Sequence, residues 1–152
     1  MITIATISPF VGHFTCCALM TGVCLFVAVV HYPLMARVGR DNWIAYERAH
    51  TDRTGYVVAP IMLAEAALAA WVSLAGAALP MWWWINLAGL AVCWAVTFGV
   101  NVPQHVRLAK AWDDRTYRAL VAMHWVRTLV WLARTLMMVL FSNMTGSGPG
   151  LH

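Results

Sequence analysis

Charge is scarce in this chain of 152 residues, because only 11% of them are Asp, Glu, Lys or Arg, against about 25% in an ordinary soluble domain. Acidic residues number only six, and the first charged side chain is Arg37. This scarcity excludes a disordered tail, a water-soluble enzyme of ordinary composition and a nucleic-acid-binding domain, so we expect no nucleic-acid partner. An uncharged stretch as long as the first 36 residues is typical of a membrane span.

Hydrophobic residues make up 62% of the chain, which also holds nine Trp, nine Met and six His. This composition predicts an integral membrane protein. The four cysteines all fall inside predicted spans, where Cys usually behaves as a small apolar residue, and no disulfide framework is expected. They are Cys16, Cys17, Cys24 and Cys93.

The few basic residues are concentrated. Eight of the ten lie in segments 37–53 and 107–118, and each segment is flanked by long apolar stretches. The positive-inside rule places both segments on the cytoplasmic face. Because the Leu79-Pro80 turn, the N-terminus and the tail carry no Lys or Arg, we expect four spans with both termini outside the cytoplasm.

The sequence predicts an all-α integral membrane protein, an antiparallel four-helix transmembrane bundle. The expected spans are about 9–35, 56–78, 82–102 and 115–141, all within one membrane domain over 1–141. A short cytoplasmic-side helix beginning at Trp43 is expected between spans 1 and 2, with Gly55 and Pro60 interrupting it before span 2. Residues 142–152 are rich in Gly and Ser and predict a flexible tail.

Three charged residues fall at membrane depth: Glu65, Arg127 and Arg134. Such residues normally face a partner or a cavity, because a charge facing lipid costs a few kcal/mol. Counting at about 1.5 Å per residue from span ends near 78 and 142 puts Glu65 about 20 Å and Arg127 about 22 Å from the outer face. The count therefore predicts a buried Glu65–Arg127 pair, which serves either chemistry or helix register.

The same count places His31, His105 and His124, from three different spans, in one layer near the cytoplasmic side. Glu47 and His50 form a Glu-x-x-His pair on one helix face, and they could fold over that layer. Such a constellation indicates a metal centre with His31, His50, His105 and His124 as ligands, or a haem held by His31, His105 and His124. Few carboxylates are present, so copper, zinc or haem is favoured over a di-iron centre, although iron stays open. The alternative is that these histidines only donate hydrogen bonds.

Four segments carry a resemblance to known sequences. They are His31-Tyr-Pro33, Glu47-Arg-Ala-His50, Pro60-Ile-Met-Leu-Ala-Glu65 and His124-Trp-Val-Arg127-Thr-Leu-Val-Trp131-Leu-Ala-Arg134. Over about Val30 to Met138 the chain resembles a group of small bacterial four-span membrane proteins of unassigned function and, more distantly, the anthrone-oxygenase-like family. The resemblance implies oxidation of a lipophilic polycyclic or quinol-like compound in the bacterial inner membrane. It does not identify the residues that act.

The leading hypothesis is a membrane-embedded oxidoreductase or cofactor-binding protein for a quinol-like or aromatic substrate. Glu47 or Glu65 would then handle protons, and Arg127 would stabilise a developing phenolate or quinone oxygen. The alternative is a non-catalytic accessory subunit of a larger membrane complex, with the same residues fixing helix register. The expected partners are the lipid bilayer, a quinone or lipophilic aromatic compound, and either further copies of the chain or a larger complex.

Overall fold

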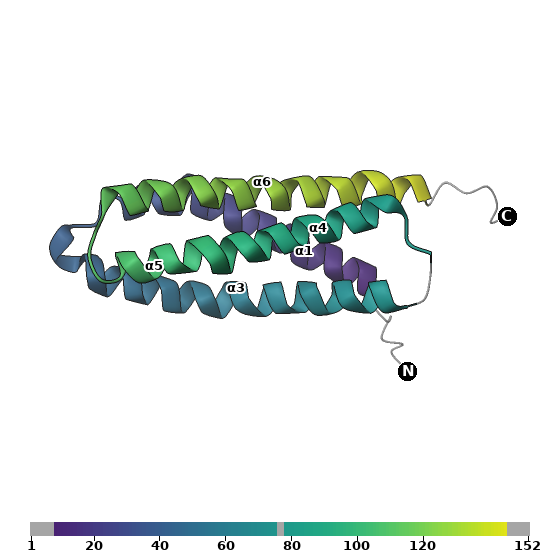
Figure 1. The fold of residues 1–152 in the computed structure, drawn as a ribbon, viewed down its shortest axis with the longest axis horizontal. Helices are drawn as coiled ribbons and strands as arrows, with labels where there is room; N and C mark the ends of the chain where they lie inside the picture. The colour runs from purple at the N-terminus through teal and green to yellow at the C-terminus, as the bar shows by residue number, and fades with distance from the viewer. Residues whose placement is uncertain (1–7, 76–77, 146–152) are drawn as a thin grey trace, which may run out of the picture.

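The computed structural model describes residues 8–75 and 78–145, which are almost entirely helical. The first rod comprises α1 (Pro9–Phe26), the π-helical η1 (Val27–His31) and α2 (Tyr32–Met35). A 3-10 turn, η2 (Arg40–Asn42), leads into α3 (Trp43–Leu74). The third rod comprises α4 (Met81–Val96), the π-helical η3 (Thr97–Asn101) and α5 (Val102–Leu108), and α6 (Asp114–Thr145) is the fourth. Figure 1 shows the rods side by side, with the start of α1 and the end of α6 at the same end of the molecule.

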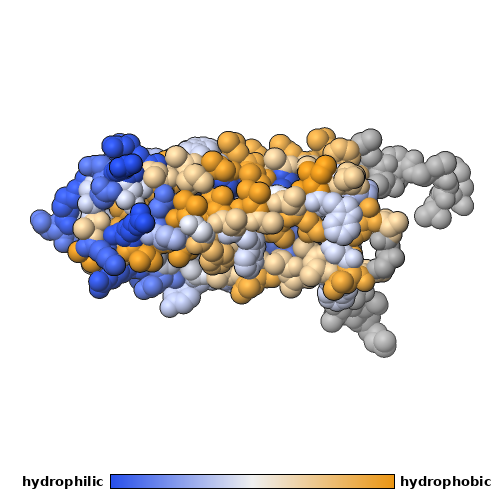
Figure 2. Space-filling view, viewed as in Figure 1, coloured by the Kyte–Doolittle hydropathy of each residue, from blue (hydrophilic) through white to orange (hydrophobic). Residues whose placement is uncertain are grey.

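Three of the rods are long and apolar enough to cross a membrane: Pro9–Met35, Arg40–Leu74 and Met81–Leu108. Helix α6 has the length, but His124, Arg127 and Arg134 lower its hydropathy. Hydrophilic side chains gather at the end that holds α2, the start of α3 and the α5–α6 connection, whereas apolar side chains cover most of the remaining visible surface (Figure 2). This distribution is typical of a membrane protein.

Helix α3 corrects one prediction, because Gly55 and Pro60 do not interrupt it. The expected short cytoplasmic-side helix is the first part of one helix that continues into the second span. Pro60 has no N–H to donate to the Tyr56 carbonyl four residues before it. Both residues lie on the exposed surface. A proline there is tolerated without packing disruption, although it removes one backbone hydrogen bond. The second span also ends at Leu74, four residues before the predicted boundary at 78.

Both π-helical segments lie directly before a proline. The Tyr32 N–H donates to the Val27 carbonyl and the Val102 N–H to the Thr97 carbonyl, each five residues back, and Pro33 and Pro103 follow. A proline clashes with the carbonyl four residues before it, and a widened π turn relieves that clash while the rod stays continuous. The wide turns end at His31 and Asn101, both near the candidate site.

The start of α6 agrees with prediction. Asp113 accepts a 2.7 Å hydrogen bond from the Thr116 N–H, as an N-cap residue does. Hydrogen bonding from Thr116 lowers the pKa of the exposed Asp113 carboxyl. At its other end α6 runs to Thr145, past the predicted boundary at 141, and the rest of the expected tail, 146–152 with His152, lies outside the described residues.

Candidate functional site

The predicted histidine layer is largely present at the polar end of the bundle. The rings of His31 and His50 stack at 4.3 Å between centroids, and the His50 and His105 rings are 5.5 Å apart. Glu47, one turn before His50 on α3, places its Oε1 2.6 Å from Nδ1 of His105. We call His31, His50, His105 and Glu47 the histidine cluster. The Glu-x-x-His pair therefore does fold over the layer, as the spacing predicted.

Within the cluster, a carboxylate, an imidazole and a phenol form a chain. The His105 Nδ1–H donates to Glu47, and the hydroxyl of Tyr32 lies 3.2 Å from the other ring nitrogen of His105. Tyr32 is itself held by Tyr117, whose hydroxyl donates to the Tyr32 backbone carbonyl at 2.7 Å. Glu47 is fully buried, and its second oxygen has no hydrogen-bond partner among the described residues. A buried carboxylate in this position fixes the orientation of the His105 ring.

His124 lies next to the cluster but has a different role. Its Nε2–H donates to the Cys24 carbonyl at 2.9 Å, and its Nδ1 accepts from Nε of Arg127 at 3.2 Å. The Tyr32 ring packs on it edge-on, with 4.8 Å between centroids. Both nitrogens are occupied, so His124 holds Arg127 in place and has no lone pair free for a metal or a haem.

The predicted ligand set does not fit a metal ion in this arrangement. The part of the chain that the structure describes holds no group of three or more His, Cys, Asp or Glu side chains placed to bind one. His105 is engaged at both ring nitrogens, and His50 uses Nδ1 in a 3.1 Å contact with the Thr54 hydroxyl. A metal or haem therefore stays a prediction from sequence, and the chemistry proposed below uses none.

A cavity of about 320 Å³ opens beside the cluster, between α3 and the η3–α5 segment. Most of its wall is apolar. The exposed Gly55, Phe98 and Val106 line it, so its mouth is on the side of the bundle, which in a membrane faces lipid. We call this cavity the lateral pocket. Its polar lining consists of His50, Thr51, Thr54, Thr97, Asn101, His105 and Arg127.

Asn101 is the most unusual residue of the lateral pocket. It is 2% exposed, and neither its amide nitrogen nor its amide oxygen has a hydrogen-bond partner among the described residues. Buried amides are normally paired, because an unpaired one costs about 1–3 kcal/mol. Arg127, 8% exposed, lines the same pocket and donates from Nη1 to the Thr97 hydroxyl at 3.0 Å. A buried amide and a guanidinium facing one apolar cavity suit a ligand with a ring oxygen.

The chain matches no protein-family model, no curated protein and no solved structure. Its function must therefore be inferred from the site.

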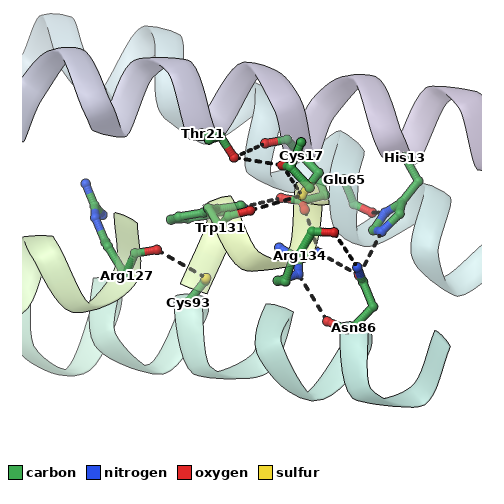
Figure 3. A network of polar contacts seen from close by, with 10 residues as sticks. His13, Cys17, Thr21, Glu65, Asn86, Cys93, Arg127, Trp131 and Arg134 are labelled. Atoms are coloured by element: carbon green, nitrogen blue, oxygen red, sulfur yellow. Dashed lines mark hydrogen bonds and ion pairs between the residues drawn. The ribbon is translucent and has the colours of Figure 1, made fainter. Parts of the chain in front are cut away.

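Glu65 corrects a second prediction, because its partner is Arg134 and not Arg127. Oε1 of Glu65 lies 2.7 Å from Nη2 of Arg134, and both side chains are buried. The Trp131 indole donates to the other carboxylate oxygen at 3.2 Å. As Figure 3 shows, Arg127 is directed away from this ion pair, which also involves Asn86 and His13.

The prediction failed because the span ends were misplaced. Counted from the observed ends at Leu74 and Thr145, Glu65 lies about 14 Å, Arg134 about 17 Å and Arg127 about 27 Å along the helices. Errors of four residues at one end and three at the other thus changed the partner. Glu65 belongs to a buried network toward the end of the bundle opposite the histidine cluster, far along the bundle from Glu47, and takes no part in the lateral pocket.

All four rods contribute to this buried network, which consists of His13, Glu65, Asn86, Trp131 and Arg134. His13 of α1 donates to the Glu65 carbonyl, and Arg134 donates to the Asn86 carbonyl and side-chain oxygen of α4. None of these residues lines the lateral pocket. The network ties the rods together and fixes their register.

The sequence interpretation missed Tyr32, Asn101 and Thr97. Tyr32 stands next to His31 in the His-Tyr-Pro segment, and Asn101 stands two residues before Pro103. An uncharged polar residue inside an apolar span, close before a proline, was the available signal for Asn101.

Proposed function

We propose that this protein spans the membrane four times and binds a small quinol-like or aromatic compound in the lateral pocket, exchanging a proton with a ring hydroxyl of that compound. The unpaired amide of Asn101, buried in the wall of an apolar pocket that opens sideways, is the observation that carries this proposal. A compound that enters from the bilayer is lipophilic, and its oxygen would satisfy the amide.

The fourth span is supported by the outer surface of α6. Between Trp125 and Phe141 its two charged residues, Arg127 and Arg134, are buried, whereas its exposed large side chains are apolar. They are Trp125, Val126, Leu129, Leu136, Val139, Leu140 and Phe141. A helix with arginines inward and an apolar outer face fits in lipid although its overall hydropathy is low. The polar end carries both basic segments and is then the cytoplasmic end, with both termini outside the cytoplasm.

The chemistry follows from the residues that line the lateral pocket. The Asn101 amide donates to a ring carbonyl or accepts from a ring hydroxyl, so it binds either form of the ligand. Arg127, fixed by His124 and Thr97, stabilises the negative charge of a phenolate. His50 keeps Nε2 unused and accepts a hydrogen bond from the ring hydroxyl, while the neighbouring Glu47–His105 pair, whose second carboxylate oxygen is unpartnered, takes up the released proton.

A quinol loses two protons and two electrons when it is oxidised to a quinone. Exchange of a hydroxyl proton is therefore not by itself an oxidation. Binding and proton exchange are what the described residues support by themselves.

The test uses two glycines with open space around them. A Cβ at Gly55 or at Gly99 meets nothing within 4 Å, but only Gly55 lines the lateral pocket. Gly55→Leu should fill the pocket and weaken binding of a short-chain naphthoquinol by about tenfold or more. Gly99→Leu, the matched control, should leave the Kd unchanged.

Equilibrium dialysis of the purified protein in neutral detergent measures both values, and the melting temperature shows that each variant folds. Equal binding by the two variants, or no saturable binding by the unmodified protein, would overturn the proposal and favour the non-catalytic accessory subunit.

A further inference from the structure

A second hollow lies on the other side of α3, between that helix and the first rod. Its volume is about 450 Å³, and we call it the α1–α3 groove. Toward the middle of the bundle its lining is apolar, from Gly22, Val23, Phe26, Val27, Val57 and Val58. Toward the polar end it is lined by His31, His50, Arg53 and Thr54. The groove is therefore apolar toward the middle of the bundle, and toward the polar end its side chains carry charge or form hydrogen bonds.

The polar end of the groove continues into a hollow of about 400 Å³ that shares His31, His50, Arg53 and Thr54 with it and adds Tyr46 and Ala49. The Tyr46 ring is nearly parallel to the rings of His31 and His50, at 6.2 and 6.4 Å between centroids. These three rings form a polar stack beside this hollow.

Arg53 supplies the charge at this level. It is exposed, and the ion pairs found in the described part of the chain join His105 to Glu47 and Arg134 to Glu65, which leaves Arg53 without a carboxylate partner. It also stands in the segment 37–53, which holds four of the ten basic residues.

We propose that the α1–α3 groove binds one anionic phospholipid of the leaflet at the polar end. Its acyl chain lies along Gly22, Phe26 and Val57, and its phosphate pairs with Arg53 in the adjoining hollow. Basic pockets between membrane helices on the cytoplasmic side bind anionic headgroups in this way. The apolar length of the groove argues against a free inorganic anion, and the unpaired arginine argues against a neutral lipid.

The experiment compares phosphatidylglycerol with phosphatidylcholine, added to the delipidated full chain in neutral detergent and counted by native mass spectrometry. The unmodified protein should retain one phosphatidylglycerol more tightly than phosphatidylcholine, by about fivefold. Arg53→Gln should abolish this preference. Arg48→Gln is the matched control, because Arg48 is exposed on the same helix but lines neither hollow, and it should preserve the preference.

Gly22→Leu tests the part that binds the acyl chain, because a Cβ there meets nothing within 4 Å and the position lines this groove but not the lateral pocket. It should weaken retention of both lipids while binding of naphthoquinol in the lateral pocket persists. Gly55→Leu should do the reverse, so failure of this proposal and failure of the proposed function are distinguishable. Equal retention of the two lipids, equal effects of Arg53→Gln and Arg48→Gln, or competition by inorganic phosphate alone would overturn the proposal.

Discussion

At the scale of single residues, the buried Glu65 carboxylate depends on one cation. Arg134→Met leaves Glu65 charged and unpaired in the interior, which should cost about 3–5 kcal/mol of unfolding free energy. Adding Glu65→Gln to Arg134→Met should recover part of that loss. Unfolding of the single and double variants in a denaturing detergent measures the coupling.

Arg127→Met is the control, since Arg127 contacts His124 and Thr97 instead of Glu65. Its effect should add to that of Glu65→Gln without coupling. A coupling energy between Glu65 and Arg127 as large as that with Arg134 would contradict the observed pairing.

The unpaired Asn101 amide should lower the stability of the protein while strengthening ligand binding. Replacing an unpaired buried amide by an apolar side chain of similar size removes a desolvation cost, so Asn101→Leu should raise the free energy of unfolding by about 1 kcal/mol. The same variant should bind naphthoquinol more weakly. Thermal melting and dialysis measure the two effects, and a variant that is less stable yet binds normally would show that the amide has only a structural role.

Much of the candidate site could be predicted from residue patterns in the sequence. The Glu-x-x-His spacing placed Glu47 and His50 on one helix face over the histidine layer. Depth counting placed His31, His105 and His124 in that layer. The Glu65 partner could not be obtained in this way, because pairing depends on where α3 and α6 end. Composition does not fix those ends to better than about a turn.

At the scale of the helices, α4 and α6 approach each other closely because Gly89 has no side chain. A Cβ at Gly89 would lie 2.8 Å from Cδ of Arg134, whose far end is held by Glu65 and Asn86. Small residues allow membrane helices this proximity. Gly89→Ala should therefore destabilise the protein by about 1–3 kcal/mol.

Gly99→Ala, in open space on the same rod, serves as the comparison. It should be neutral or slightly stabilising, because Ala is the better helix former. Detergent-induced unfolding checks both variants, and equal stability of the two would show that α4 and α6 can separate at no cost.

The sequence predicted the ends of the first rod correctly but not the continuity of the second. The first rod matches the predicted span 9–35, because no charged residue interrupts it before Arg37. The second was predicted as two helices because Gly and Pro normally end a helix. The sequence does not show that Pro60 lies on the exposed side, where the lost hydrogen bond disturbs no packing.

At the scale of the whole molecule, the number of crossings separates a four-span from a three-span protein. Reporters active only outside the cytoplasm, fused after Leu79, after Lys110 and at the end of α6, should be active, inactive and active. The two active positions lie at the end opposite the basic segments. An inactive reporter at the end of α6 would mean that this helix does not cross, and its buried arginines would need another explanation.

The central claim is that a lipophilic ring compound occupies the lateral pocket. Photolabelling with an azido-naphthoquinone in native membranes, followed by peptide mapping, tests it most directly. The account predicts saturable labelling of residues in 50–62 and 97–109, with unlabelled naphthoquinol competing and with strong reduction in Gly55→Leu but not in Gly99→Leu. Labelling spread over the outer faces of the helices, unaffected by competitor, would contradict it.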